Sequence, residues 1–192
     1  MKTYLDKNVY EAALERIAYC FQEFDNVLVA FSGGKDSGVL LNLCYNYADE
    51  HGLLDKLTMY HLDYEAQYQM TTEYVTRTFL EQFPGIRKMW YCVPIKAQSA
   101  CALGEPYWTP WDAAKKKLWV RAMPENPYVV HEGNLDVPFR HGMVDYEFQD
   151  KLSRHFAKKR GTTAVMVGLR ADESLNLSLI HISEPTRLQL IS

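Results

Sequence analysis

The chain has 192 residues, of which 47% are hydrophobic, and its formal net charge is −3. This length and composition predict one α/β domain with an ordinary core and exclude a second large domain. The mildly acidic balance argues against a large nucleic-acid footprint, although a local basic patch stays open. No apolar run follows Met1, and none reaches the roughly 18 residues of a membrane span. We therefore expect no signal peptide, no membrane span and a cytoplasmic location.

The cysteines and histidines show no metal-binding or disulfide pattern. Cys20, Cys44, Cys92 and Cys101 form neither a C-x-x-C pair nor a zinc-ligand spacing. Cys20 and Cys44 fall on the apolar faces of predicted helices, so we expect reduced, buried thiols. No histidine pair at i, i+4 accompanies a glutamate, and a zinc site therefore has little support.

Helices and strands alternate along the first half of the chain. Asn8 suits the N-cap of a first helix, whose apolar residues recur at helical spacing from Tyr10 to Phe24. Strands are predicted at residues 27–31, 57–62 and 86–93, with helices at residues 35–49 and 67–82 between them. This alternation predicts βαβ units, a mostly parallel sheet covered on both faces, and hence a Rossmann-like three-layer sandwich.

A glycine-rich loop joins the first predicted strand to the helix that follows it. Its residues are Ser32, Gly33, Gly34, Lys35, Asp36 and Ser37. The glycines let the backbone approach a ligand closely, and the new helix directs free N–H groups and its positive dipole end at that ligand. The loop therefore predicts an anion site, and a tight turn with incidental polar residues is the alternative.

The residue types in this loop narrow the anion to a polyphosphate. Ser32 and Ser37 offer hydroxyl donors, and Lys35 adds a compact positive charge. Asp36 would repel a bare phosphate, so its carboxylate fits a magnesium ion that it shares with phosphate oxygens. The loop is neither a Walker A motif, because Asp36 follows the lysine, nor a G-x-G-x-x-G motif.

Regular periodicity fails in residues 94–142, which contain Trp108, Trp111, Trp119 and several prolines. So long an irregular segment is usually functional. We interpret it as an excursion over the C-terminal edge of the sheet that lines a second-substrate pocket. The alternative is that its aromatic residues only attach a long loop to the surface. The lysines at 115–117 predict a solvated face rather than a phosphate-binding patch.

The last predicted elements are a helix that begins at Asp145 and a strand at residues 163–167. Phe148, Leu152 and His155 would face inward from the helix. Lysines and an arginine in its last turn suit the helix dipole, and Gly161 would end it.

Three segments together resemble the PP-loop ATP-pyrophosphatase superfamily and, within it, the phosphoadenosine phosphosulfate reductase family. They are residues 31–37, the stretch His61-Leu62-Asp63-Tyr64-Glu65-Ala66-Gln67, and residues 167–174. The resemblance runs from about residue 4 to residue 176. It is strongest to a branch encoded beside a ParB-like partner. It implies a fold of the adenine nucleotide alpha-hydrolase (HUP) type.

The resemblance implies that the three segments converge on one nucleotide at the carboxyl ends of parallel strands. The glycine-rich loop would hold the polyphosphate of ATP with Mg²⁺. Asp63 would bind a ribose hydroxyl or magnesium, with a solvated loop carboxylate as the alternative. Gly168 would let the backbone approach the ligand. Arg170 would bind phosphate oxygens or form a surface ion pair, and Glu173 would orient Arg170 or contact the metal.

The reaction implied is attack on the α-phosphorus of ATP with pyrophosphate as the leaving group. Lys35, magnesium and the loop amides would stabilise the departing charge, with Asp36 and Arg170 in the catalytic set. A substrate oxygen would be adenylylated, ready for displacement by sulfur or nitrogen.

Two other functions stay open at this point. One is a thiol-dependent phosphoadenosine phosphosulfate reductase, whose cysteine lies in a Glu-Cys-Gly-type tail that does not occur before Asn176. The intact loop favours ATP over that substrate. The other is a non-catalytic, nucleotide-dependent regulatory or DNA-linked partner of a ParB-like protein.

Residues 177–192 resemble the in-frame translation of a transposase-end sequencing adapter. We therefore expect the natural domain to be truncated near Asn176, and we exclude these residues from the predicted fold.

Overall fold

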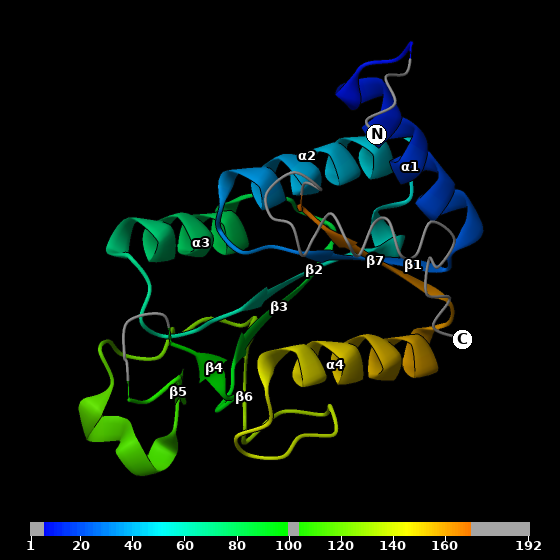
Figure 1. Ribbon diagram of the computed structural model, residues 1–192. Helices are drawn as coiled ribbons and strands as arrows, with labels where there is room; N and C mark the ends of the chain where they lie inside the picture. The colour runs from blue at the N-terminus through cyan, green and yellow to red at the C-terminus, as the bar shows by residue number, and fades with distance from the viewer. Residues whose placement is uncertain (1–5, 100–103, 170–192) are drawn as a thin grey trace.

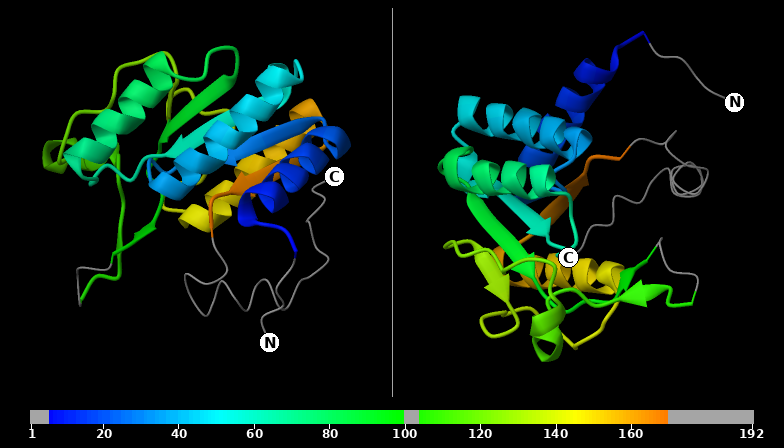
Figure 2. Two further views of the ribbon diagram at one scale, coloured as in Figure 1. Left: turned by 90° about the horizontal axis from the view of Figure 1, so that it is seen from above. Right: turned by 90° about the vertical axis from the view of Figure 1, so that its left-hand side faces the viewer.

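The computed structural model describes residues 6–99 and 104–169. Its main sheet has five parallel strands in the order β6-β3-β2-β1-β7. The strands are β1 (Asn26–Ala30), β2 (Leu57–Leu62), β3 (Arg87–Cys92), β6 (Val129–His131) and β7 (Thr163–Val167). The helices are α1 (Val9–Glu23), α2 (Lys35–Glu50), α3 (Gln69–Glu81) and α4 (Asp145–Arg160). Figures 1 and 2 show α1, α2 and α3 on one face of the sheet and α4 on the other. The predicted three-layer α/β fold is therefore confirmed.

The predicted caps set the ends of the helices. Asn8 forms a capping box with Glu11, whose N–H lies 2.9 Å from the Asn8 side-chain oxygen. At the end of α4, Gly161 adopts a φ of +101° and donates its N–H to Ala157. Tyr10 departs from the predicted apolar stripe because it is 60% exposed, where the first turn of α1 projects past the sheet (Figure 1).

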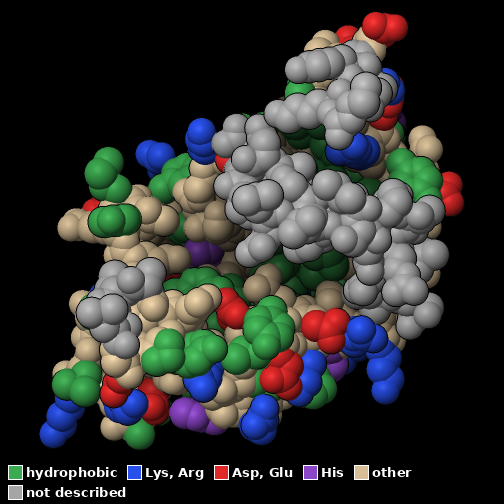
Figure 3. Space-filling model, in the orientation of Figure 1, with side chains coloured by type: hydrophobic (Ala, Val, Ile, Leu, Met, Phe, Trp, Pro, Cys, Tyr) green, Lys and Arg blue, Asp and Glu red, His purple; other side chains and the backbone are tan. Residues whose placement is uncertain are grey.

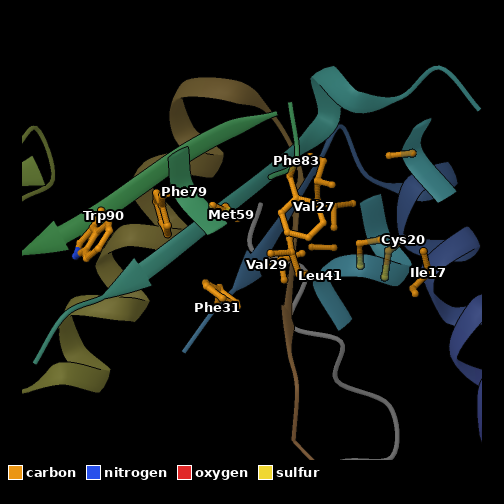
Figure 4. Packing of buried hydrophobic residues seen from close by; sticks show 14 of the residues in the cluster. Ile17, Cys20, Val27, Val29, Phe31, Leu41, Met59, Phe79, Phe83 and Trp90 are labelled. Carbon is orange, nitrogen blue, oxygen red and sulfur yellow. The ribbon is translucent and has the colours of Figure 1, made fainter. Parts of the chain in front are cut away.

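Both faces of the central strands β1 and β2 are buried, as in other parallel sheets. Val27, Val29 and Phe31 point from the first strand and the residue after it toward α1 and α2 (Figure 4). Leu28 points to the opposite face and belongs to a second cluster with Phe148 of α4. The helices thus hold β1, and the loop that follows it, from both sides.

The excursion is more ordered than its sequence predicts. Its third strand, β6, pairs with β3 and forms one edge of the main sheet. Two further strands, β4 (Ala97–Gln98) and β5 (Tyr107–Trp108), pair with each other, and η2 (Ala113–Leu118) follows. The prediction missed β6 because a strand of three residues is too short to show a period. In η2 the lysines at 115–117 are exposed, as expected.

None of the helices in the part of the chain that the structure describes is long and apolar enough to cross a bilayer.

Candidate functional site

The loop between β1 and α2 is ordered by its own hydrogen bonds. Ser37 Oγ donates to the Gly34 carbonyl over 3.0 Å and lies 2.9 Å from Ser32 Oγ. The N–H of Gly34 in turn donates to Ser32 Oγ over 3.2 Å. Helix α2 begins at Lys35 with Gly34 as its N-cap, and because glycine has no side chain, no side-chain cap is made there. This arrangement suits an anion at the start of the helix.

Gly33 allows the loop to pack tightly against α3. Its φ is +83°, and a Cβ atom at this position would lie 2.8 Å from Val75 Cγ2 and 3.0 Å from Thr71 Cγ2. Only glycine meets both the left-handed backbone and the lack of space. The loop is therefore fixed between its own strand and the first turns of α3.

The two charged residues of the loop lie in the first turn of α2. Lys35 is exposed, and it forms no ion pair with the residues that the structure describes. Asp36 is half-buried. No cluster of three or more His, Cys, Asp or Glu side chains suited to a metal occurs within residues 6–99 and 104–169.

Gly168 brings the third motif against the first. A Cβ atom on Gly168 would lie 2.8 Å from the carbonyl carbon of Asp36 and 2.8 Å from the amide nitrogen of Ser37. The chain after β7 thus packs directly on the first turn of α2. Arg170 and Glu173, which the sequence also assigned to the site, lie outside the described residues.

Asp63 is buried rather than solvated, so the interpretation as a solvated loop carboxylate is wrong. Its side chain is 0% exposed. One guanidinium nitrogen of Arg121 lies 2.5 and 2.7 Å from its two oxygens, and Trp90 Nε1 donates to Oδ2 over 2.8 Å. The N–H of Glu65 donates to Oδ1 over 2.8 Å. A ribose hydroxyl or a metal ion at this carboxylate would have to displace one of these donors.

Glu65, two residues later, holds the excursion. Its Oε2 accepts from the Trp111 N–H and its Oε1 from the Val120 N–H, both over 2.8 Å. Its own carbonyl accepts from Arg121 Nε over 2.9 Å. The sequence analysis missed Arg121, Trp111 and this role of Glu65. The only available signal was that Asp63 and Glu65 share one polar stretch, because no spacing pattern connects them with residues 111–121.

His61 lies directly beneath the loop. It is 1% exposed, and its Nδ1 lies 2.8 Å from the carbonyl oxygen of Phe31, the residue before Ser32. Burial lowers the pKa of His61, which favours the neutral imidazole. Because a carbonyl can only accept, the proton is on Nδ1. The Gln67 side chain lies beside the His61 ring, and its hydrogen bond raises the pKa of His61 by less than burial lowers it.

Comparison with known proteins identifies the family. Residues 26–187 match the phosphoadenosine phosphosulfate reductase domain. The chain belongs to this family. The uncharacterised protein YbdN of Escherichia coli K12 is 32% identical to it over 174 residues. That alignment covers 90% of the chain and 41% of YbdN, so the chain spans less than half the length of this relative.

In this phosphoadenosine phosphosulfate reductase family member, three thiols are buried. The exposed fractions are 6% for Cys20, 0% for Cys44 and 1% for Cys92. Burial raises the pKa of each thiol, and that of Cys44 to about 12. Thiols of this kind stay protonated near neutral pH and are poor nucleophiles. The prediction of buried thiols is confirmed for Cys20 and Cys44, and Cys101 lies outside the described residues.

The excursion also carries a surface groove of about 540 Å³ beside β6. Trp119, Met123, Pro124 and His131 contribute to its walls, and Lys116 and Glu125 add charge. The second-substrate pocket expected in the excursion stays a prediction.

Proposed function

We propose that this chain binds ATP with Mg²⁺ and cleaves it between the α- and β-phosphates. The observation that carries the proposal is the loop before α2. Its N-cap is Gly34, which makes no side-chain cap at the start of α2, and Lys35 is exposed to solvent in the first turn. The matched family narrows the ligand to an adenine nucleotide, and the charged pair Lys35 and Asp36 favours a triphosphate with magnesium.

Each part of the loop has a task in this reaction. The first-turn N–H groups of α2 and Lys35 Nζ would hold the pyrophosphate oxygens and stabilise the charge that develops on them. Asp36 would share the Mg²⁺ ion with those oxygens, and the ion when bound would neutralise part of the phosphate charge. Arg170, two residues after Gly168, is proposed to bind the α-phosphate, with Glu173 to orient it.

The acceptor would be a substrate oxygen that attacks the α-phosphorus in line with the departing pyrophosphate. The new P–O bond replaces the bond to pyrophosphate and yields an adenylylated acceptor. The sequence resemblance is the basis for proposing sulfur or nitrogen as the group that later displaces the adenylate. For the thiol-dependent reductase, the buried positions of Cys20, Cys44 and Cys92 count against an attacking thiol at any of these three sites.

A ParB-like protein is the partner that we propose from the sequence resemblance. Nucleic acid has less support. Figure 3 shows acidic and basic side chains interspersed over α4 on the face that it draws. Among them, Arg154 pairs with Asp150, and Lys151 pairs with Glu147. Such alternation lacks the one-sign patch that binds a phosphate backbone.

The test is a binding and turnover assay with the whole chain and ATP labelled at the α-phosphate. Calorimetry would measure binding of ATP in Mg²⁺ and in EDTA, with phosphoadenosine phosphosulfate as the competing ligand. Release of pyrophosphate would measure cleavage. We expect Asp36→Ala to abolish the Mg²⁺-dependent cleavage and spare the fold. Lys117→Ala, an exposed lysine in η2, is the matched control.

Full activity in Asp36→Ala would refute the mechanism. Tight ATP binding without any cleavage by the unsubstituted chain would instead favour a nucleotide-dependent switch. Binding of phosphoadenosine phosphosulfate in preference to ATP would favour the reductase.

A further inference from the structure

One short stretch links the excursion with the glycine-rich loop of residues 32–37, which we call the nucleotide loop because we propose that it binds the nucleotide. We call residues 61–67 the relay segment. At its first residue, the Nδ1–H of His61 donates to the carbonyl of Phe31 over 2.8 Å. Phe31 is the last residue before the loop and is 2% exposed. This hydrogen bond connects the peptide between Phe31 and Ser32 with the His61 ring.

The middle of the relay segment binds the excursion, and it also bonds Trp90 of β3. The carboxylates of Asp63 and Glu65 accept hydrogen bonds from the side chain of Arg121 and from the backbone of Trp111 and Val120. The carbonyl of Asp63 accepts from Trp111 Nε1 over 2.8 Å. The guanidinium carbon of Arg121 lies 4.8 Å from the centre of the Trp111 ring. The position of these excursion residues therefore depends on the relay segment.

Two backbone conformations along this path are strained. Glu65 has a φ of +65° and Trp111 a φ of +56°, which residues other than glycine rarely adopt. The Glu65 carboxylate bonds the Trp111 N–H directly, so the two strained residues hold each other in place. Strain of this kind persists only where the surroundings impose it, and it clusters at clamps and switches.

We propose that the relay segment couples occupancy of the nucleotide loop to the position of the excursion, and that His61, Asp63 and Glu65 are positioning residues. In this role Asp63 and Glu65 do not bind the nucleotide. They hold Arg121 and Trp111 in the positions needed to bind the second substrate. The proposal rests on the proposed function in one respect, since it requires a nucleotide at the loop. Coupling of this kind needs a segment whose contacts differ between the free and bound states.

The experiment uses the tryptophans of the excursion as reporters. Three of the four tryptophans, Trp108, Trp111 and Trp119, lie in the excursion. The fourth, Trp90, lies in β3, and none lies in the nucleotide loop or in α2. The whole chain is titrated with α,β-methylene ATP and Mg²⁺, which resists cleavage at the proposed bond. Calorimetry follows binding and tryptophan emission follows the excursion. We expect an emission shift that saturates together with binding.

His61→Phe keeps a ring of similar size and removes the donor to Phe31. Because the loop keeps its own hydrogen bonds, this variant is expected to bind nucleotide within about threefold of the original affinity but to lose the emission shift. His61→Asn returns an N–H donor and is expected to restore part of the shift. His51→Phe, at the exposed C-cap of α2, is the matched control and should keep the shift in full.

Nucleotide binding without an emission shift in the unsubstituted chain would overturn the relay and leave the proposed function intact. An undiminished shift in His61→Phe would do the same. Absence of any nucleotide binding would overturn both the relay and the proposed function. If His61→Phe fails to fold, Glu65→Gln replaces it, because its amide nitrogen would face one of the two N–H donors. This variant is also expected to bind nucleotide without the shift, and an unchanged shift would refute the relay.

Discussion

Arg121 and Asp63 form a buried ion pair in which one guanidinium nitrogen lies 2.5 and 2.7 Å from the two carboxylate oxygens. The Asp63 side chain is 0% exposed, and that of Arg121 is 21% exposed. Removal of one partner leaves the other charge buried and uncompensated. We expect Arg121→Met to lower the free energy of unfolding by about 3–5 kcal/mol in urea denaturation.

The control for this ion pair is a double substitution. Asp63→Asn together with Arg121→Met removes both charges, so most of the lost stability should return. Arg154→Met, which breaks an exposed pair with Asp150, should leave the unfolding midpoint unchanged. Equal destabilisation by Arg121→Met and Arg154→Met would contradict the buried role of Asp63.

Gly168 should tolerate no side chain. In Gly168→Ala the new Cβ would meet Asp36 and Ser37 backbone atoms at 2.8 Å, and backbone cannot rotate away as a side chain can. We expect a loss of about 1–3 kcal/mol in the free energy of unfolding. ATP affinity should fall at least about tenfold, because the first turn of α2 is displaced. Calorimetry and denaturation measure the two effects, and Gly104→Ala, with no atom within 4 Å of its Cβ, is the control.

His61 should make stability depend on pH. Burial lowers its pKa in the folded protein, whereas the unfolded histidine titrates near about 6.5. Between these two pKa values the unfolded chain binds more protons, so the free energy of unfolding falls as the pH drops below about 6.5. The loss approaches about 1.4 kcal/mol per pH unit from this residue. Urea denaturation from pH 5 to 7.5 should show a shallower slope in His61→Phe, and an identical slope would refute the assignment.

Asn134 covers the outer edge of β6. Its Oδ1 accepts from the His131 N–H over 2.7 Å and its Nδ2 donates to the Val129 carbonyl over 3.2 Å, as a neighbouring strand would. Asn134→Ala should uncover this edge and increase self-association. Self-association is measured by light scattering after size-exclusion chromatography, over a range of protein concentrations. Asn126→Ala, which removes only an acceptor for the Tyr128 N–H, should not change the association state.

The thiols give a test of the reductase alternative. In Cys101→Ser the remaining cysteines are Cys20, Cys44 and Cys92, which are all buried with a raised pKa. The folded variant should not react with Ellman's reagent at pH 8, and all three thiols should react in urea. A rapidly reacting thiol in the folded variant would bring the thiol-dependent reaction back into consideration.

Features that depend on neighbours along the chain could be predicted from the residues alone. Asn8 and Gly161 predicted the helix ends because caps are made within a few residues. The change from the apolar strand to Ser32, Gly33 and a helical period predicted the nucleotide loop for the same reason. The hydrogen bonds within residues 32–37 join residues at most five positions apart, and nucleotide binding by the loop stays a prediction.

The contacts of the polar stretch after β2 could not be predicted, because they depend on how distant parts of the chain pack together. Asp63 and Arg121 are 58 residues apart, and Glu65 and Val120 are 55 apart. No periodicity or spacing encodes contacts over such separations, because the path of the excursion across the sheet edge brings these residues together. Strand β6 could not be predicted either. Its three residues are too few to show a strand pattern, and its position beside β3 is set by pairing with that strand. The loop could be predicted from the sequence because its contacts are local. The hydrogen bonds that Arg121 and Trp111 make to Asp63 could not be predicted, because they join residues far apart in the chain.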